Sequence, residues 1–260
     1  NVKLTKSADQ NILITWENVD KIQGIFIDEF GNKKSNIVEF LSEFEISQYS
    51  MVASGSGTFK IAFYNIDEQA ICVQEVDSNG QAIGELYVIN NSTSNSYFDW
   101  VQSSDQLKLI WHDGSNSGNI YGQTFNNGEA SSEQLIATMG HKLWEITSEE
   151  LSENSTAIAS SRWGESNNAN LLIIDNETYD IKKYQSILDT TPSENSGLTR
   201  FVGIDIAAFE NGEFAMVRHQ QMAHSEVQIN AQLFDEMGNS ITSTHQINQH
   251  NTVVQQFPLA

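Results

Sequence analysis

The chain has 260 residues and a formal net charge of −21, from 13 basic and 34 acidic residues. So few cations argue against a nucleic-acid-binding face, which must neutralise phosphates, and against binding to an anionic membrane. The acidic balance favours solubility, cations and neutral ligands, or reflects adaptation to salty surroundings. No apolar run reaches the roughly 20 residues that a membrane span needs, so membrane insertion is not expected.

Strand-like apolar runs end in turn sequences at regular intervals along the chain. In GIFIDEFGN the first such strand ends at Ile27, and Asp28 and Gly31 then supply a hairpin turn. The corresponding strand ends in the later runs are Val76, Phe125, Ile174 and Phe234. The first three steps are each 49 residues and the last is 60. A fixed period of tens of residues indicates a repeat architecture.

An earlier strand in each repeat ends in a bulky residue and gives a second set of landmarks. These residues are Trp16, Tyr64, Trp111, Trp163 and Arg218. Their spacings are 48, 47, 52 and 55 residues. The later units are longer because SEELSEN (148–154) and DTTPSENSG (189–197) lengthen two loops.

The second unit reads as four short strands, SMVAS, FKIAFY, AICVQEV and ELYVIN. Four strands in about 49 residues is the size of a propeller blade. We therefore predict an all-β fold, a single five-bladed β-propeller domain over 1–260. The predicted units are 1–46, 47–95, 96–139, 140–198 and 199–248. The strand ends that mark the period, Ile27, Val76, Phe125, Ile174 and Phe234, are expected to pack between blades.

Residues 249–260 read as one more first strand, which either closes the ring against the first unit or is the stub of a further repeat. If this segment closes the ring, its removal should lower the melting temperature. An incomplete six-bladed propeller and a pair of β-sandwiches are the alternative folds.

The units resemble the propeller-like repeats of large bacterial extracellular and surface proteins of the adhesin or hemagglutinin type. The resemblance rests on IDIAAFENGEFAMVR (204–218), INAQLFDEMGN (229–239) and GNIYGQTF (118–125). The fourth unit departs from the pattern because it lacks the turn glycine. The resemblance implies a secreted or bacterial cell-surface location and a binding or spacer role, and it implies no catalytic residue.

Motifs for catalysis and metal binding are missing from the sequence. There is no EF-hand loop, no H-E-x-x-H pair and no G-x-S-x-G elbow. The single cysteine, Cys72, lies in a strand-like run and is interpreted as a small buried apolar residue. The turn aspartates Asp28, Asp77, Asp175 and Asp235 are interpreted as caps of their own turns, with calcium binding as the alternative.

The repeated bulky residues are one candidate ligand-binding set. Trp16, Tyr64, Trp111, Trp163 and Arg218 would lie on a ring around the propeller axis. Large aromatic residues pack between blades, but they also stack on sugars, and Arg218 would then be a polar anchor. Both roles remain open at this point.

Three carboxylates form a second candidate set. Asp99, Glu145 and Asp205 belong to the predicted innermost strands, where lone carboxylates need a partner or a cation. We expect at least two of them to face the axis and to hold water or a cation, with Ca2+ as the expected ion.

These observations favour an extracellular binding or adhesion module that recognises a glycan or another cell-surface ligand, through loops between blades. A glycoside hydrolase with an acidic axial pocket and a structural spacer in a larger surface protein are the alternatives. No catalytic residue is assigned, and the oligomeric state is left open.

Overall fold

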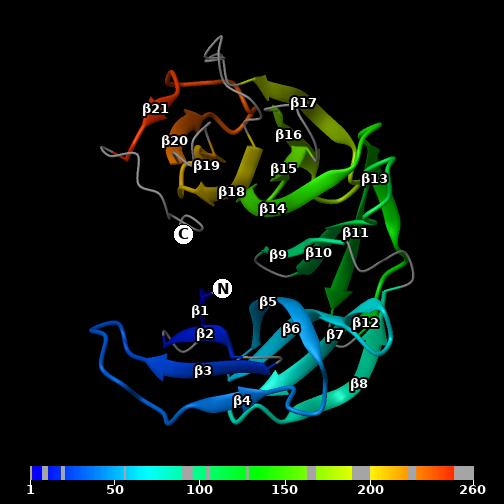
Figure 1. Cartoon of the computed structure of the whole chain (residues 1–260), viewed down its shortest axis with the longest axis vertical. Helices are drawn as coiled ribbons and strands as arrows, with labels where there is room; N and C mark the ends of the chain where they lie inside the picture. Colours follow the sequence, from blue (N-terminus) through cyan, green and yellow to red (C-terminus); the bar gives the residue numbers. More distant parts are fainter. Residues whose placement is uncertain are drawn as a thin grey trace.

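The computed structural model describes residues 2–7, 11–18, 21–55, 57–89, 96–103, 106–126, 129–162, 168–188, 200–221 and 227–248. Every regular element in these ranges is a β-strand. Five antiparallel sheets lie around one axis, and in each sheet the first strand is innermost (Figure 1). The fold is therefore the five-bladed β-propeller that the 49-residue period predicts. No helix in the described ranges is long and apolar enough to cross a membrane.

The blades are numbered 1 to 5 in chain order. Their innermost strands are β1 (Val2–Lys6), β5 (Ile46–Gly55), β9 (Phe98–Gln102), β14 (Leu143–Ser152) and β18 (Arg200–Ala208). The second strands are β2 (Ile12–Asn18), β6 (Thr58–Asn65), β10 (Leu107–His112), β15 (Ser155–Arg162) and β19 (Phe214–Gln221). The third strands are β3 (Lys21–Ile27), β7 (Ala70–Asp77), β11 (Asn119–Asn126), β16 (Asn168–Asp175) and β20 (Val227–Phe234).

The outer edge of each sheet varies more than its inner strands. The outer strands are β4 (Val38–Phe40), β8 (Ala82–Val88), β12 (Glu129–Ala130), β13 (Gln134–Thr138), β17 (Ile181–Leu188) and β21 (His245–Gln246). Blade 3 has two of them because β12 and β13 both pair with β11. Each sheet lies within one predicted unit, except that β5 starts one residue early, at Ile46. The predicted strand in 249–260 lies outside the described residues.

The pairing of second and third strands defines which residues are equivalent between blades. The residues that mark the period pair with Ile12, Phe59, Leu107, Thr156 and Phe214. Four residues further along each second strand, the equivalent positions are Trp16, Phe63, Trp111, Ser160 and Arg218.

The predicted ring of bulky residues does not hold at Tyr64, and the fourth predicted member, Trp163, lies outside the described residues. In blade 2 the equivalent residue is Phe63, and Tyr64 points to the opposite face because side chains alternate along a strand. In blade 4 it is Ser160, three positions before Trp163. The sequence comparison aligned the strands on their last bulky residue, whereas the sheet aligns them on hydrogen-bond register.

Four hydrophobic clusters fill the spaces between consecutive blades. Val76, Phe125, Ile174 and Phe234 each lie in one of these clusters, as predicted. Ile27 does not, and its side chain is partly exposed. Cys72 is buried in the cluster between blades 1 and 2, which confirms its interpretation as a core residue.

The repeated DE-x-GN sequence forms the hairpin turn after the third strand. In blade 1, Asp28 Oδ1 accepts hydrogen bonds from the amides of Phe30 (3.0 Å) and Asn32 (2.8 Å). The Asn32 side chain donates to Asp28 Oδ2 at 3.0 Å, and Gly31 takes a φ of 82°. Asp235 makes the same bonds to Asn239. These bonds confirm the capping role of the turn aspartates and lower the pKa of Asp28.

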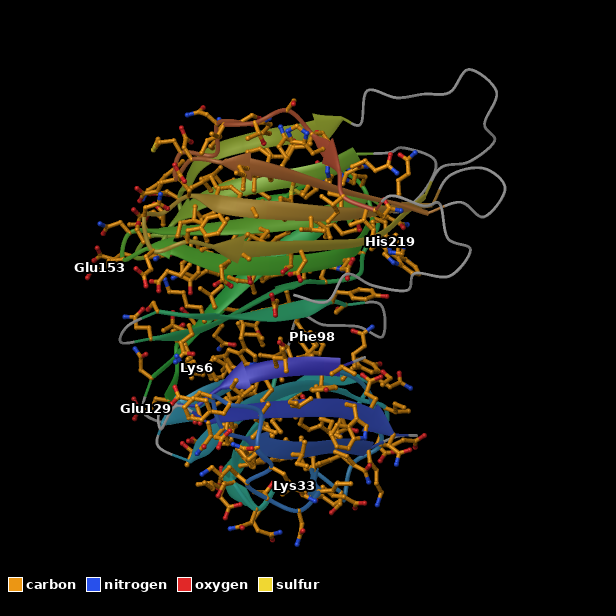
Figure 2. All side chains as sticks on the ribbon, turned by 90° about the vertical axis from the view of Figure 1, so that its left-hand side faces the viewer. Lys6, Lys33, Phe98, Glu129, Glu153 and His219 are labelled. Atoms are coloured by element: carbon orange, nitrogen blue, oxygen red, sulfur yellow. The ribbon has the colours of Figure 1, made fainter. Side chains whose placement is uncertain are left out.

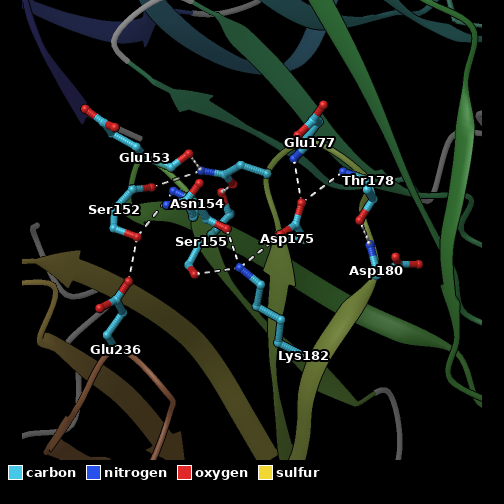
Figure 3. Close-up of polar contacts among 12 residues, drawn as sticks. Ser152, Glu153, Asn154, Ser155, Asp175, Glu177, Thr178, Asp180, Lys182 and Glu236 are labelled. Carbon is cyan, nitrogen blue, oxygen red and sulfur yellow. Dashed lines mark hydrogen bonds and ion pairs between the residues drawn. The ribbon is translucent and has the colours of Figure 1, made fainter.

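Blade 4 forms its turn without a glycine. Asp175 Oδ1 accepts from the amides of Glu177 (2.9 Å) and Thr178 (3.0 Å), and Lys182 forms an ion pair of 3.0 Å with Asp175 Oδ2 (Figure 3). The two amide bonds and the lysine hold the pKa of Asp175 well below its usual range. The left-handed conformation falls on Tyr179, with a φ of 61°. A charged partner thus compensates for the missing glycine.

Gly31 and Gly80 occupy the same place in two equivalent turns, with φ values of 82° and 81°. A Cβ on Gly80 would lie 2.1 Å from the backbone oxygen of Glu39 in the neighbouring blade, whereas one on Gly31 would meet nothing within 4 Å. We expect Gly31→Ala to lower the free energy of unfolding by about 1–2 kcal/mol through φ strain alone. Gly80→Ala should cost clearly more, and urea denaturation measures both. Equal losses would contradict the contact between this turn and blade 1.

Candidate functional site

Innermost strands of three consecutive blades bring four carboxyl groups together at the axis. Asp99 comes from β9, Glu145 and Glu149 from β14, and Asp205 from β18. The four influence one another electrostatically, and we call them the axial carboxyl cluster. Sequence reasoning found three of them and missed Glu149. The i, i+2, i+4 spacing of a strand face, read from Glu145, would have pointed to it.

Asp99 is held by donors from two other blades. Its Oδ1 accepts a hydrogen bond from Ser50 Oγ of β5 at 3.0 Å. Its Oδ2 accepts from the amide of Ser148 at 3.0 Å and lies 3.3 Å from Thr147 Oγ1, both in β14. This carboxylate therefore connects blades 2, 3 and 4 at the axis.

Blades 4 and 5 are connected in the same way. Thr147 Oγ1 also lies 3.3 Å from Asp205 Oδ1, so its single proton can serve Asp99 or Asp205 but not both. Asp205 Oδ1 accepts from the amide of Ile206 at 2.9 Å. Glu145 Oε2 accepts from the amide of Ile204 in blade 5 at 3.0 Å.

Burial shifts the protonation of the cluster. Loss of solvation raises the pKa of Glu145 and of Glu149 to about 7, and that of Asp205 to about 6, with neighbouring carboxylates adding to each shift. Lys3 of β1 acts in the opposite direction on Glu145 and Asp205 but does not cancel the effect. The cluster therefore holds protons at neutral pH and can both accept and donate hydrogen bonds.

Two partly exposed aromatic rings lie beside this cluster. Tyr97 directly precedes β9, and Trp144 directly precedes Glu145 in β14. Their ring centroids are 5.9 Å apart, and Tyr97 also stacks on the buried His112 at 5.6 Å. Glu145 is close enough that its charge contributes to the raised pKa of Tyr97, after burial. Sequence reasoning missed both rings, because neither occupies a repeated position.

The predicted ring of ligand-binding residues is mostly buried. Trp111 and Arg218 are fully buried and Tyr64 nearly so. Trp111 stacks on Tyr121 at 5.7 Å, and Arg218 Nη2 donates to Thr244 Oγ1 at 3.0 Å. As placed here, these three side chains offer no surface to a ligand. Trp16 is partly exposed, and Trp163 lies outside the described residues.

The metal prediction has a different outcome. Asp99, Glu145 and Asp205 do gather at the axis. Within the ranges that the structure describes, however, no group of three or more His, Cys, Asp and Glu side chains could hold a metal ion as it stands. Calcium binding at these three residues stays a prediction.

Comparison with known proteins identifies the fold and no closer relationship. No protein-family model matches the chain, and no curated protein is significantly similar to it in sequence. Among solved structures, 95% of the chain aligns with 79% of the fucose-recognising lectin of Aleuria aurantia, a six-bladed β-propeller, at 11% identity and a TM-score of 0.55. It also aligns with 82% of a subtype N10 neuraminidase-like protein of A/little yellow-shouldered bat/Guatemala/060/2010, at 10% identity and a TM-score of 0.61, again over 95% of its own length.

A third similar structure is hydrazine synthase of Kuenenia stuttgartiensis, at 12% identity and a TM-score of 0.59. The match covers 95% of this chain and 65% of that one, so this chain spans just under two thirds of its length. At such identities the similarity shows a shared propeller fold alone.

The protonation of the cluster predicts how stability depends on pH. The folded state has pKa values of about 7 for Glu145 and Glu149, against an ordinary value of 4.5, so it binds more protons than the unfolded chain between these values. Stability should therefore fall as the pH rises from about 5 to about 8. Thermal unfolding across this range measures the slope. Glu149→Gln should flatten it, whereas Glu85→Gln on the exposed strand β8 should leave it unchanged. A slope of the opposite sign would contradict the burial of these carboxyls.

A cation would balance the same charges in place of protons. If calcium binds at Asp99, Glu145 and Asp205, the melting temperature at pH 8 should be higher in calcium than in chelator, because an ion that binds only the native state stabilises it. Asp99→Asn should remove the difference. An unchanged melting temperature would contradict the calcium prediction and leave protons as the counter-charge.

Proposed function

We propose that this chain is a carbohydrate-binding propeller of an extracellular bacterial protein, and that it binds a neutral sugar at the axial carboxyl cluster. The observation that carries this proposal is the pair of partly exposed rings Tyr97 and Trp144, whose centroids are 5.9 Å apart and of which Tyr97 lies close enough to Glu145 to feel its charge. Aromatic faces cover the apolar C–H faces of sugars, while carboxyl groups bind sugar hydroxyls. Both kinds of contact are available here side by side.

The protonation of the cluster suits hydroxyl ligands. A sugar hydroxyl both donates and accepts a hydrogen bond, so it needs acceptors and donors in one place. Asp205 and Glu145, with pKa values of about 6 and 7, supply either role near neutral pH. This is the physical reason for preferring a sugar to a simple cation.

The charge of the chain argues for a neutral ligand. A net charge of −21 repels sialic acids, uronic acids and phosphorylated sugars over long distances. Within the site, Lys3 is the one cation that acts on the described carboxyls of the cluster, and the carboxyls outnumber it. We therefore place fucose, galactose, mannose and other uncharged sugars ahead of acidic ones.

Two further lines of support are indirect. The Aleuria aurantia lectin is a propeller with a described mode of fucose recognition, which makes sugar binding by this fold a known possibility. The resemblance of the repeats to those of adhesin-type surface proteins supports a secreted or cell-surface location. Neither line identifies the ligand.

A glycoside hydrolase is the second candidate, and the raised pKa values favour it. Hydrolysis of a glycosidic bond uses one carboxyl that is protonated at working pH and another that is ionised. Glu145 and Glu149, with pKa values of about 7, are candidates for the acid. Turnover of neutral chromogenic glycosides that Glu145→Gln abolishes would establish this activity.

The binding proposal is tested by a glycan array, followed by calorimetry with the best neutral sugar. Trp144→Ala and Asp205→Asn should each weaken binding by about tenfold or more, the loss of about 1.4 kcal/mol of contact energy. Tyr184→Ala is the matched control, because this tyrosine is 52% exposed on the outer strand β17. It should leave binding unchanged. Binding of acidic glycans alone, or equal losses in Tyr184→Ala and Trp144→Ala, would contradict the proposed site.

A further inference from the structure

One face of blade 1 is partly exposed where the equivalent face of every other blade is buried. On this face Ile12, Ile14, Trp16 and Ile27 are all partly exposed. The equivalent residues in blades 2 to 5 are all at most 9% exposed: Phe59, Ile61, Phe63 and Val76; Leu107, Leu109, Trp111 and Phe125; Thr156, Ile158, Ser160 and Ile174; Phe214, Met216, Arg218 and Phe234.

The innermost strand of blade 1 shows the same exposure. Val2 and Leu4 of β1 are 52% and 59% exposed. Thr5, between Leu4 and Lys6, points the other way and donates a hydrogen bond to the Met51 carbonyl of blade 2. We call the side of blade 1 that carries Leu4 and Trp16 its open face.

Blade 5 has a partly exposed face too, and it is the opposite one. Ala215, Val217, Ile229 and Ala231 are partly exposed. The equivalent residues in blades 1 to 4 are all buried: Leu13, Thr15, Ile22 and Gly24; Lys60, Ala62, Ile71 and Val73; Lys108, Ile110, Ile120 and Gly122; Ala157, Ala159, Ala169 and Leu171. In those blades this face packs against the next blade in chain order.

The two open faces lie on the same side of the ring. The described residues form four hydrophobic clusters between consecutive blades and none between blade 5 and blade 1. Figure 2 looks at this side, with blade 5 above, blade 1 below and Phe98 of blade 3 labelled between them. A tightly closed five-bladed ring would bury these two faces against each other, and here the described residues of both remain partly exposed.

We infer that these two faces are the docking surface for one further four-stranded blade of the same repeat, supplied as a sixth unit of the same polypeptide. Everywhere else in the molecule, each of these two faces is covered by the complementary face of an adjacent repeat. One inserted blade covers both at once. The alignment with a six-bladed lectin agrees with a missing sixth blade. It covers 95% of this chain and 79% of the lectin, and five blades are five sixths of such a ring.

A second copy of the chain fits these faces less well. The two faces differ, so copies would join blade 5 of one molecule to blade 1 of the next. Such heterologous contacts build open-ended assemblies unless their rotation closes a ring. An inserted blade closes the ring within one molecule.

The test joins a second copy of residues 47–95 after Asn248 and compares this six-unit chain with the native chain. Blade 2 is the right donor, because its Tyr64 face already packs against Trp111, which is equivalent to Trp16. The six-unit chain should unfold in one transition, with a melting temperature raised by at least about 5 °C. Iodide should quench the fluorescence of Trp16 less in the six-unit chain. An added unit that is digested by protease, with no change in melting temperature, would overturn the inference.

A pair of substitutions tests whether the open face of blade 1 is free to bind a sixth blade, is already covered within the chain, or is buried in an oligomer. Leu4→Glu should leave the native chain unchanged and remove the gain of the six-unit chain. Phe30→Glu, at a turn residue that is 81% exposed, should change neither. If Leu4→Glu destabilises the native chain as much as the six-unit chain, the face is already covered and the inference fails. It also fails if the native chain is an oligomer of 29.0 kDa subunits that Leu4→Glu dissociates.

Discussion

Each sheet of this molecule is apolar on both faces, and the need to cover both faces organises everything else. A single blade cannot bury either face alone, so each blade depends on its neighbours for stability. Phe59 and Phe63 cover one side of blade 2, while Ala62 and Tyr64 cover the other. Because both faces of a sheet must be covered, the sheets pack face to face around the axis. The innermost strands of successive blades therefore lie close together.

The candidate site is a by-product of that convergence. Side chains at the axis are buried by neighbouring blades whether or not they are apolar, and polar ones must find partners there. Asp99 finds them in blades 2 and 4, and Thr147 in blades 3 and 5. The same burial raises the pKa of Glu145. With this raised pKa, the carboxyl group can donate as well as accept a hydrogen bond near neutral pH. The packing of the blades and the raised pKa values of the candidate site therefore have one physical origin.

The fold could be predicted from the sequence because its signals are local. An aspartate and a glycine three residues apart form a turn through hydrogen bonds within five residues, as at Asp28 and Gly31. The recurrence of such turns along the chain gives the period of the repeat. The site could be predicted only in part, because its contacts cross between blades. Asp205 could be placed at the axis by counting strands. The error at Tyr64 arose from a one-residue register difference, which reverses the face of a side chain and cannot be read from residue size.

The four clusters also determine how the chain can fold. Each cluster draws its residues from two consecutive units, such as Leu13 to Val76 or Leu151 to Phe234, and among the described residues none joins the first unit to the last. These four clusters can each form without the first and last units meeting, so the loop-closure entropy of each is low for a β-protein of this size. Each core is complete as soon as the next unit has left the ribosome, and the propeller can grow one blade at a time during synthesis.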